Sequence, residues 1–177
     1  GNSLAGLMGQ QVNLPIQILV NNTMMDHDTS ITSRLSEVFY LWGTPLEMNK
    51  EKLSQIGLEA KALMKSTKDA WVWPKGQQLT SAAFQPPAQR DGMMPLMVLV
   101  KGQFPDAYAG KERPAWPVVE QQPGQFPPPP PPGEDAPAAA VTPAPGKLVL
   151  IGCSEMFRKQ FLQAGNLDLF MNAVDAV

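Results

Sequence analysis

The sequence predicts a layered α/β domain, and three observations lead to this prediction. Short apolar segments with the length of strands recur along the chain, and residues 95–104 and 147–152 are the clearest. The second of these segments enters a tight turn at residues 153–155 and then a segment with helical spacing. Strand, tight turn and helix in succession are typical of sheets covered by helices. Since 177 residues suffice for one such domain, we expect a single α/β domain over residues 1–177.

Two further strands are expected in the N-terminal part of the chain. Residues 14–20 are short and β-branched, and Asn21-Asn22 follows them as a turn signal. The polar residues 24–34 predict a loop that leads into a second strand at residues 38–41. Because residues 95–104 and 147–152 are almost continuously apolar, we expect both to be buried strands.

Residues 58–64 fit two kinds of structure. Their alanine, leucine, methionine, glutamate and lysine residues are helix formers. Yet apolar and charged residues also alternate there, which is the period of a strand. Propensity favours a helix and periodicity favours a strand, so the residues by themselves leave both open.

The C-terminal residues predict two helices. Residues 156–163 have the pattern of a short helix, and Gly165 ends it. We expect Asn166 to cap a final helix and Asn172 to form a hydrogen bond from its face. The apolar face of this helix is expected to carry Phe170, Ala173, Val174 and Val177.

Prolines are concentrated in one part of the chain. The 19 prolines are about twice the usual share of roughly 5%. Most of them lie within residues 110–146, which are rich in Pro and Ala and include six consecutive prolines. Proline has no backbone N–H and favours polyproline II, so such a segment does not pair in a sheet. We expect a solvated loop between two strands, with recognition by a proline-binding partner as the alternative.

Composition excludes several classes of function. The net charge of −2 and the pI near 5.4 exclude a nucleic-acid binder that relies on neutralising phosphates. One cysteine and one histidine exclude an internal disulfide, a cysteine-rich zinc site and a His-ligated catalytic zinc within one chain. We therefore expect no metal and no cofactor. Because the chain begins at Gly1 and ends within an apolar segment, we expect an excised fragment of a longer protein.

Cys153 is the one candidate nucleophile. It follows an apolar strand and precedes a helix, as in a nucleophile elbow, and His27 as its base would be the minimum for acyl transfer. The strained turn of an elbow needs small residues, however, and Ser154 and Glu155 follow the cysteine without a glycine. We therefore expect a buried, inert cysteine and no catalytic residue. Residues 26–28 offer possible metal ligands, but neighbouring side chains of an extended segment point apart, which favours capping of a loop.

Four residues are candidates for binding. Ser66 and Thr67 place two hydroxyl groups near Trp71, and this combination suits polar recognition. Ser154, in the turn beside Cys153, is the fourth candidate. The alternative for the first three is a turn with a tryptophan in the core.

Two C-terminal segments resemble a known family pattern. The first is Gly-Lys-Leu-Val-Leu-Ile-Gly-Cys-Ser-Glu-Met-Phe at residues 146–157, and the second is Gly-Asn-Leu-Asp-Leu-Phe-Met-Asn-Ala-Val at residues 165–174. Residues 28–41, 63–71 and 95–104 fit other segments of the pattern in the same order. The chain thereby resembles auxiliary components of uncharacterised ABC-type transport systems, of the gliding-motility (GldG-type) kind. Cys153 stands where that family more often has Asp.

The resemblance implies a fold, a location and partners. It implies a strand at residues 58–64 and a partial domain similar to the glutamine-amidotransferase-like (flavodoxin-like) fold. It also implies an extracytoplasmic, periplasmic domain, anchored in the cytoplasmic membrane by segments outside residues 1–177. Its expected partners are the membrane subunits of an ABC transporter or other envelope proteins. The resemblance names no solute.

Three functions follow from these observations. The first is a non-enzymatic accessory domain of an ABC-type transport system that works by binding. The second is a cysteine-dependent hydrolase or amidotransferase that uses Cys153. The third is a purely structural interaction module in which residues 110–146 make the contact.

Overall fold

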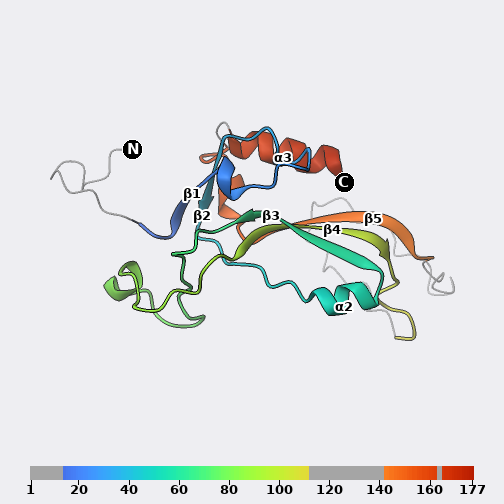
Figure 1. Cartoon of the computed structure of the whole chain (residues 1–177), viewed down its shortest axis with the longest axis horizontal. Coiled ribbons are helices and arrows are strands. Elements are labelled where there is room, and N and C mark those ends of the chain that lie inside the picture. The colour runs from blue at the N-terminus through green and yellow to red at the C-terminus, as the bar shows by residue number, and fades with distance from the viewer. Residues whose placement is uncertain (1–13, 112–141, 163–164) are drawn as a thin grey trace, which may run out of the picture.

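The computed structural model describes residues 14–111, 142–162 and 165–177, and it shows a mixed α/β fold (Figure 1). The strands are β1 (Gln17–Asn21), β2 (Glu37–Leu41), β3 (Leu58–Lys65), β4 (Pro95–Phe104) and β5 (Ala144–Ile151). The helices are α2 (Lys50–Gln55) and α3 (Gly165–Ala176), with short 3-10 turns at Asn22–Met24, Ser81–Phe84 and Glu155–Phe157. The general α/β prediction is therefore confirmed.

The five strands form two antiparallel sheets. β1 pairs with β2, so that Gln17 lies opposite Leu41 and Asn21 opposite Glu37. β4 lies between β3 and β5 in the second sheet, and both of its neighbours are antiparallel to it. β3 shows that periodicity outweighs helix propensity at residues 58–64. A flavodoxin-like fold has parallel strands, so the described part of the chain does not confirm the amidotransferase-like fold.

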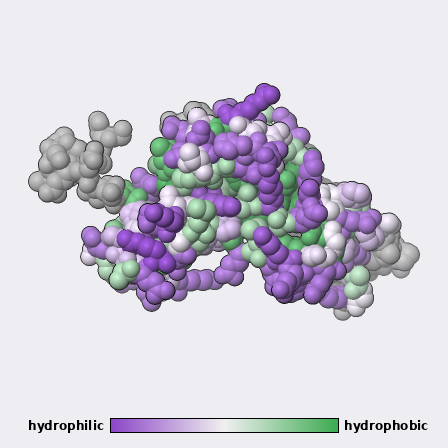
Figure 2. Space-filling view, in the orientation of Figure 1, coloured by the Kyte–Doolittle hydropathy of each residue, from purple (hydrophilic) through white to green (hydrophobic). Residues whose placement is uncertain are grey.

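The three-stranded sheet separates two hydrophobic clusters. Alternate residues of a strand face opposite sides of its sheet. On one side, Met97 and Val149 pack with Leu169 of α3. On the other side, Val98 packs with Leu53 of α2. Figure 1 shows the two helices on opposite faces of this sheet, and Figure 2 shows hydrophilic residues over the outer side of α2.

The burial of β5 differs from the prediction, which was a strand buried on both faces. Leu148 and Leu150 are 44% and 43% exposed, while Val149 and Ile151 pack in the larger cluster. β5 is an edge strand, and the short helix α2 packs on β3 at the opposite edge. One face of β5 is therefore left without a cover in the described part of the chain.

The segment between β5 and α3 also differs from the prediction. Residues 156–163 do not form a helix as far as the structure describes them, because the 3-10 turn ends at Phe157. Gly165 does not end a helix but begins α3, and a Cβ there would collide with the carbonyl oxygen of Glu37. A glycine is thus needed where α3 approaches β2 this closely.

Asn166 connects three elements instead of capping α3. Asn166 is 2% exposed and belongs to the first turn of the helix. The Oδ1 atom accepts a hydrogen bond from the Phe39 N–H at 2.8 Å, and Nδ2 donates to the carbonyl oxygens of Phe39 and Met156, both at 3.0 Å. The predicted role of Asn172 is confirmed, because its Nδ2 donates to the carbonyl oxygen of Ile31 at 3.1 Å.

The predicted apolar face of α3 is correct for one residue in four. Ala173 packs against the core with Leu169 and Ala176. Phe170, Val174 and Val177 are exposed, because the core face of the helix is turned away from them. Neither described helix has the length and apolar character needed to cross a membrane. Of the predicted loop at residues 110–146, residues 112–141 lie outside the described residues. Its last residues, 144–146, do not belong to a loop, because they form the start of β5 and pair with β4.

Replacing Asn166 by alanine is expected to lower the free energy of unfolding by about 3 kcal/mol, because three hydrogen bonds are lost and buried backbone groups are left unpaired. Asn172→Ala is the matched control, since it changes helix propensity equally but removes one hydrogen bond, for a loss of about 1 kcal/mol. Urea unfolding of both variants measures the difference. Equal losses would contradict the central role of Asn166.

Candidate functional site

Ser66 lies directly after β3 and is buried. Its N–H donates to the carbonyl oxygen of Met94 at 2.8 Å, and its Oγ accepts a hydrogen bond from the Met94 N–H at 2.9 Å. The hydroxyl group therefore extends the pairing of β3 with β4 beyond the strand ends. Its hydrogen-bonding capacity is engaged within the fold.

Trp71 lies on the same segment, which folds back against residues 90–94. The carbonyl oxygen of Ala70 accepts hydrogen bonds from the N–H groups of Asp91 and Gly92, at 3.0 and 3.2 Å. The Arg90 guanidinium stands 5.1 Å from the centroid of the Trp71 ring, within the range of a cation–π contact. Trp71 is half-buried. Its ring thus already holds a cation of the chain itself.

Thr67 is exposed beside Ser66, whereas Ser154 belongs to a different part of the molecule. Ser154 lies in the turn after β5, is exposed, and makes no side-chain cap to the 3-10 turn that follows. Among the described residues, no hydrogen bond joins Ser154 to Ser66 or Thr67. The structure thus places Ser66, Thr67 and Trp71 on one segment and Ser154 on another, and the binding role of all four stays a prediction.

Cys153 lies in the core and not at a reactive position. It is 6% exposed, and its Sγ donates to the carbonyl oxygen of Leu41 at 2.7 Å. Nearby, burial and the neighbouring Cys153 raise the pKa of Tyr40, whose hydroxyl donates to the carbonyl oxygen of Thr44. His27 is exposed, and within the described ranges no hydrogen bond joins it to Cys153. In the described part of the chain the geometry therefore does not bring His27 to the thiol as a base.

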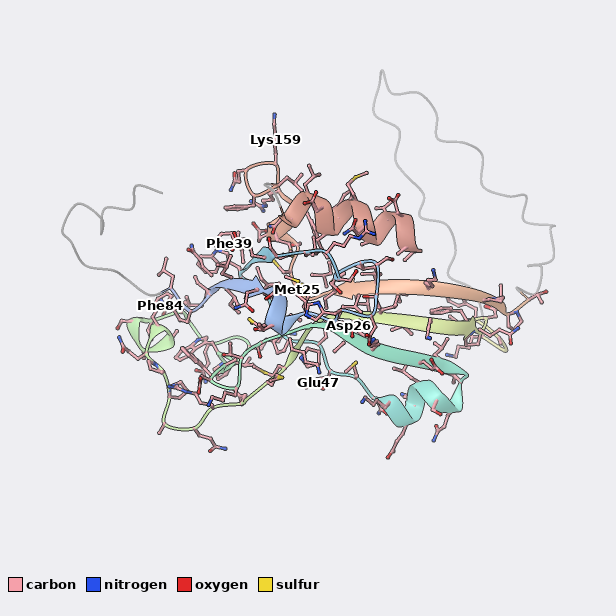
Figure 3. The ribbon with its side chains drawn as sticks, turned by 45° about the horizontal axis from the view of Figure 1, so that its top comes forward. Met25, Asp26, Phe39, Glu47, Phe84 and Lys159 are labelled. Atoms are coloured by element: carbon pink, nitrogen blue, oxygen red, sulfur yellow. The ribbon has the colours of Figure 1, made fainter. Side chains whose placement is uncertain are left out.

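Lys61 organises the loop at residues 26–28, and sequence reasoning missed it. Its Nζ lies 2.7 Å from Oδ2 of Asp26 and 3.0 Å from Oδ2 of Asp28. The Asp28 N–H also donates to Oδ1 of Asp26 at 3.1 Å. Figure 3 shows Asp26 where the loop meets the three-stranded sheet. The two carboxylates are thus held by a cation of β3, and the described residues contain no group of three acidic, His or Cys side chains able to hold a metal.

These contacts shift the pKa of both partners. Partial burial raises the pKa of Asp26, but the hydrogen bond and charge of Lys61, with the N–H of Asp28, outweigh it and leave the pKa lowered. The hydrogen bonds from Lys61 to Asp26 and Asp28 raise the pKa of that lysine. Both shifts favour the charged pair over the pH range around neutrality.

A lysine-lined hollow lies beside the outer edge of β3. Its volume is about 350 Å³. The hollow is lined by Asp26, Met48, Lys50, Ala60, Lys61, Ala62, Lys65, Met93 and Pro95. Met93 and Lys65 are sequence neighbours of the Met94–Ser66 pair, so the hollow adjoins the predicted site. Because Lys61 is paired with carboxylates, Lys50 and Lys65 supply the positive charge that an anionic group would meet here.

The burial of Cys153 predicts that its thiol reacts slowly with reagents in solution. In the native protein we expect the thiol to react with a disulfide reagent such as dithionitrobenzoate at least about 100-fold more slowly than in guanidinium chloride, because local opening must precede reaction. The release of nitrothiobenzoate measures both rates. Equal rates would indicate an accessible thiolate and favour the cysteine-dependent enzyme.

The Asp26–Lys61 pair predicts a pH dependence of stability. The pKa of Asp26 is lowered from 3.8, so its contribution is complete above this value and is lost as the pH falls through the folded-state pKa. The pKa of Lys61 is raised from 10.5, so its contribution is complete below this value and is lost as the pH rises through the folded-state pKa. Asp26→Asn is therefore expected to be less stable than the unmodified chain near pH 7, with the difference shrinking as the pH falls through the folded-state pKa of Asp26.

Glu59→Gln is the control for this measurement. Glu59 and Lys101 form an exposed pair at 3.3 Å, and its loss is expected to cost less than about 0.5 kcal/mol. Urea unfolding at several pH values compares the two variants. A loss of stability for Asp26→Asn that does not shrink as the pH falls into the acid range would contradict the assignment.

Comparison with known proteins agrees with the family resemblance. A family model described as an ABC-type uncharacterized transport system matches residues 4–173. No curated protein and no solved structure matches the chain. The family match covers nearly all of the 177 residues. The chain therefore belongs to the family of auxiliary components of uncharacterised ABC-type transport systems.

Proposed function

We propose that this domain serves its transport system as a non-enzymatic component that works by binding. The observation that carries the proposal is the state of Cys153. The candidate nucleophile is buried, donates to the backbone of Leu41 and has no base beside it in the described part of the chain. A nucleophile needs both access and an activating group. Family membership supports a role beside a transporter.

The proposed partner is a protein of the transport system and not a small solute. Small-molecule sites are usually enclosed, with a few convergent polar groups. The lysine-lined hollow is open to solvent instead, and the two carboxylates of the loop at residues 26–28 already pair with Lys61. Such a surface suits contact with the membrane subunits of the transporter or with another envelope protein.

The proposed location is the periplasmic face of the cytoplasmic membrane. The family resemblance supports an extracytoplasmic domain, anchored by segments outside residues 1–177 and of the gliding-motility kind. The full domain is proposed to have the amidotransferase-like fold, of which these residues would supply one part. We propose no metal or cofactor for it.

The test is purification of the parent protein in mild detergent, followed by identification of the transporter membrane subunits that remain bound. Cys153→Ala is expected to keep this association within about twofold, since the thiol serves the core. Loss of a hydrolase or amidotransferase activity in the same variant would favour the enzyme instead. Absence of the membrane subunits from the unmodified preparation would refute the accessory role.

A shorter chain that lacks residues 120–141, and so keeps β5 complete, tests the structural module. The accessory proposal expects unchanged binding of the membrane subunits by this deletion variant, because the surfaces described above lie outside the deleted residues. Loss of binding with unchanged thermal stability would assign the contact to the proline-rich segment.

A further inference from the structure

Helix α3 has two apolar faces. The described part of the chain covers one of them and contacts the other at Phe170, whose ring centroid lies 5.7 Å from that of Phe157. Leu169, Ala173 and Ala176 face the core. A second set of apolar side chains is between 44% and 63% exposed. This set consists of Leu167, Phe170, Met171, Val174 and Val177. Figure 1 shows α3 along the outside of the molecule, over the three-stranded sheet.

The exposed set forms one continuous stripe. Successive residues of an α-helix are about 100° apart, so positions three, four and seven residues apart share a face. Leu167, Phe170, Val174 and Val177 follow this spacing, which is the spacing of the seam in a coiled coil. Met171 widens the stripe by one position. The set thus forms a continuous apolar surface against which a second helix can pack. Single exposed apolar residues that are scattered over a protein do not form such a surface. We call it the α3 stripe.

Acidic residues border the α3 stripe on the side away from the core. Asp168 and Asp175 lie seven residues apart, so they occupy equivalent positions in successive heptads. α3 contains no Lys, Arg or His. The border therefore carries one carboxylate near each end of the helix, and Lys147 of β5 donates to the carbonyl oxygen of Ala176 in its last turn.

We propose that the α3 stripe binds an amphipathic helix of a partner protein, whose own apolar stripe is bordered by lysine or arginine. The inference rests on the proposed accessory role, and it specifies the surface and the chemistry of the partner. Apolar contact along the seam supplies the attraction, and pairing of basic residues with Asp168 and Asp175 selects the partner and its register.

Charge argues against an antiparallel pair of copies and against an anionic lipid surface. If two copies paired through this stripe in an antiparallel, two-fold arrangement, Asp168 of one copy would face Asp175 of the other, and like charges at such positions are destabilising. An anionic lipid surface would also be repelled, because helices that lie on membranes carry lysine and arginine on the border of the apolar face. A basic helix meets neither obstacle.

The test uses two synthetic helical peptides of about three heptads, each with leucine at the seam positions. One carries lysine at the bordering positions and the other carries glutamate. Fluorescence anisotropy measures the binding of each labelled peptide to the chain. We expect the lysine peptide to bind at least about tenfold more tightly than the glutamate peptide.

Variants of the chain identify the surface. Met171→Gln with Val174→Gln is expected to weaken binding of the lysine peptide at least about tenfold. Leu148→Gln with Leu150→Gln is the matched control, because these side chains are similarly exposed but lie on β5, and binding should stay within about twofold. Asp168→Lys with Asp175→Lys is expected to reverse the preference in favour of the glutamate peptide. Because the substituted side chains are exposed, circular dichroism should show unchanged folding in all three variants.

Several results would overturn the inference. These are failure of both peptides to bind, equal binding of both, or a preference that the Asp168 and Asp175 substitutions do not change. Dimerisation of the chain that Met171→Gln with Val174→Gln abolishes would assign the stripe to a second copy. Co-sedimentation with vesicles of phosphatidylcholine and phosphatidylglycerol would assign it to lipid. If the parent protein retains the transporter subunits while neither peptide binds, the α3 inference fails and the proposed function stands.

Discussion

The arrangement of the helices and strands depends on the hydrogen bonds of the Asn166 side-chain amide. It pairs with both backbone groups of Phe39 in β2 and with the carbonyl oxygen of Met156 in the preceding 3-10 turn. The adjacent Gly165 allows the helix to approach Glu37 closely. α3 is thereby fixed against the small sheet and lies over the larger one. The core face and the exposed stripe of α3 both follow from that single orientation.

The same docking engages in the fold several polar groups that could act in chemistry. The turn after β5 packs against β2, and this places Cys153 where its thiol donates to the carbonyl oxygen of Leu41. Ser66 is likewise used to continue a strand pair, and Lys61 to hold two carboxylates. Cys153, Ser66 and Lys61 are thus engaged in the fold. The described residues also present two surfaces, which are a lysine-lined hollow at one sheet edge and an apolar stripe on α3.

Local patterns predicted the strands well and the helices poorly. The boundaries of β4 were predicted to the residue, because a long apolar run between polar segments is a local signal. The burial of β5 and the role of Asn166 depend on which helices and strands pack against them. The sequence around these residues does not show which elements those are. The pairing of Lys61 with Asp26 joins residues far apart in the sequence, so spacing could not show it. The exposed face of α3 was mistaken for its core face because both faces are apolar.

The most direct test of a binding role through α3 is site-specific photocrosslinking in cells that make the parent protein. A photoreactive amino acid at Met171 is expected to crosslink to a membrane subunit of the transporter, and the same group at Leu148 on β5 is not. Both positions are similarly exposed, so accessibility does not explain the difference. A crosslink from position 171 to a second copy of the chain, or equal crosslinking to the transporter from both positions, would contradict the account.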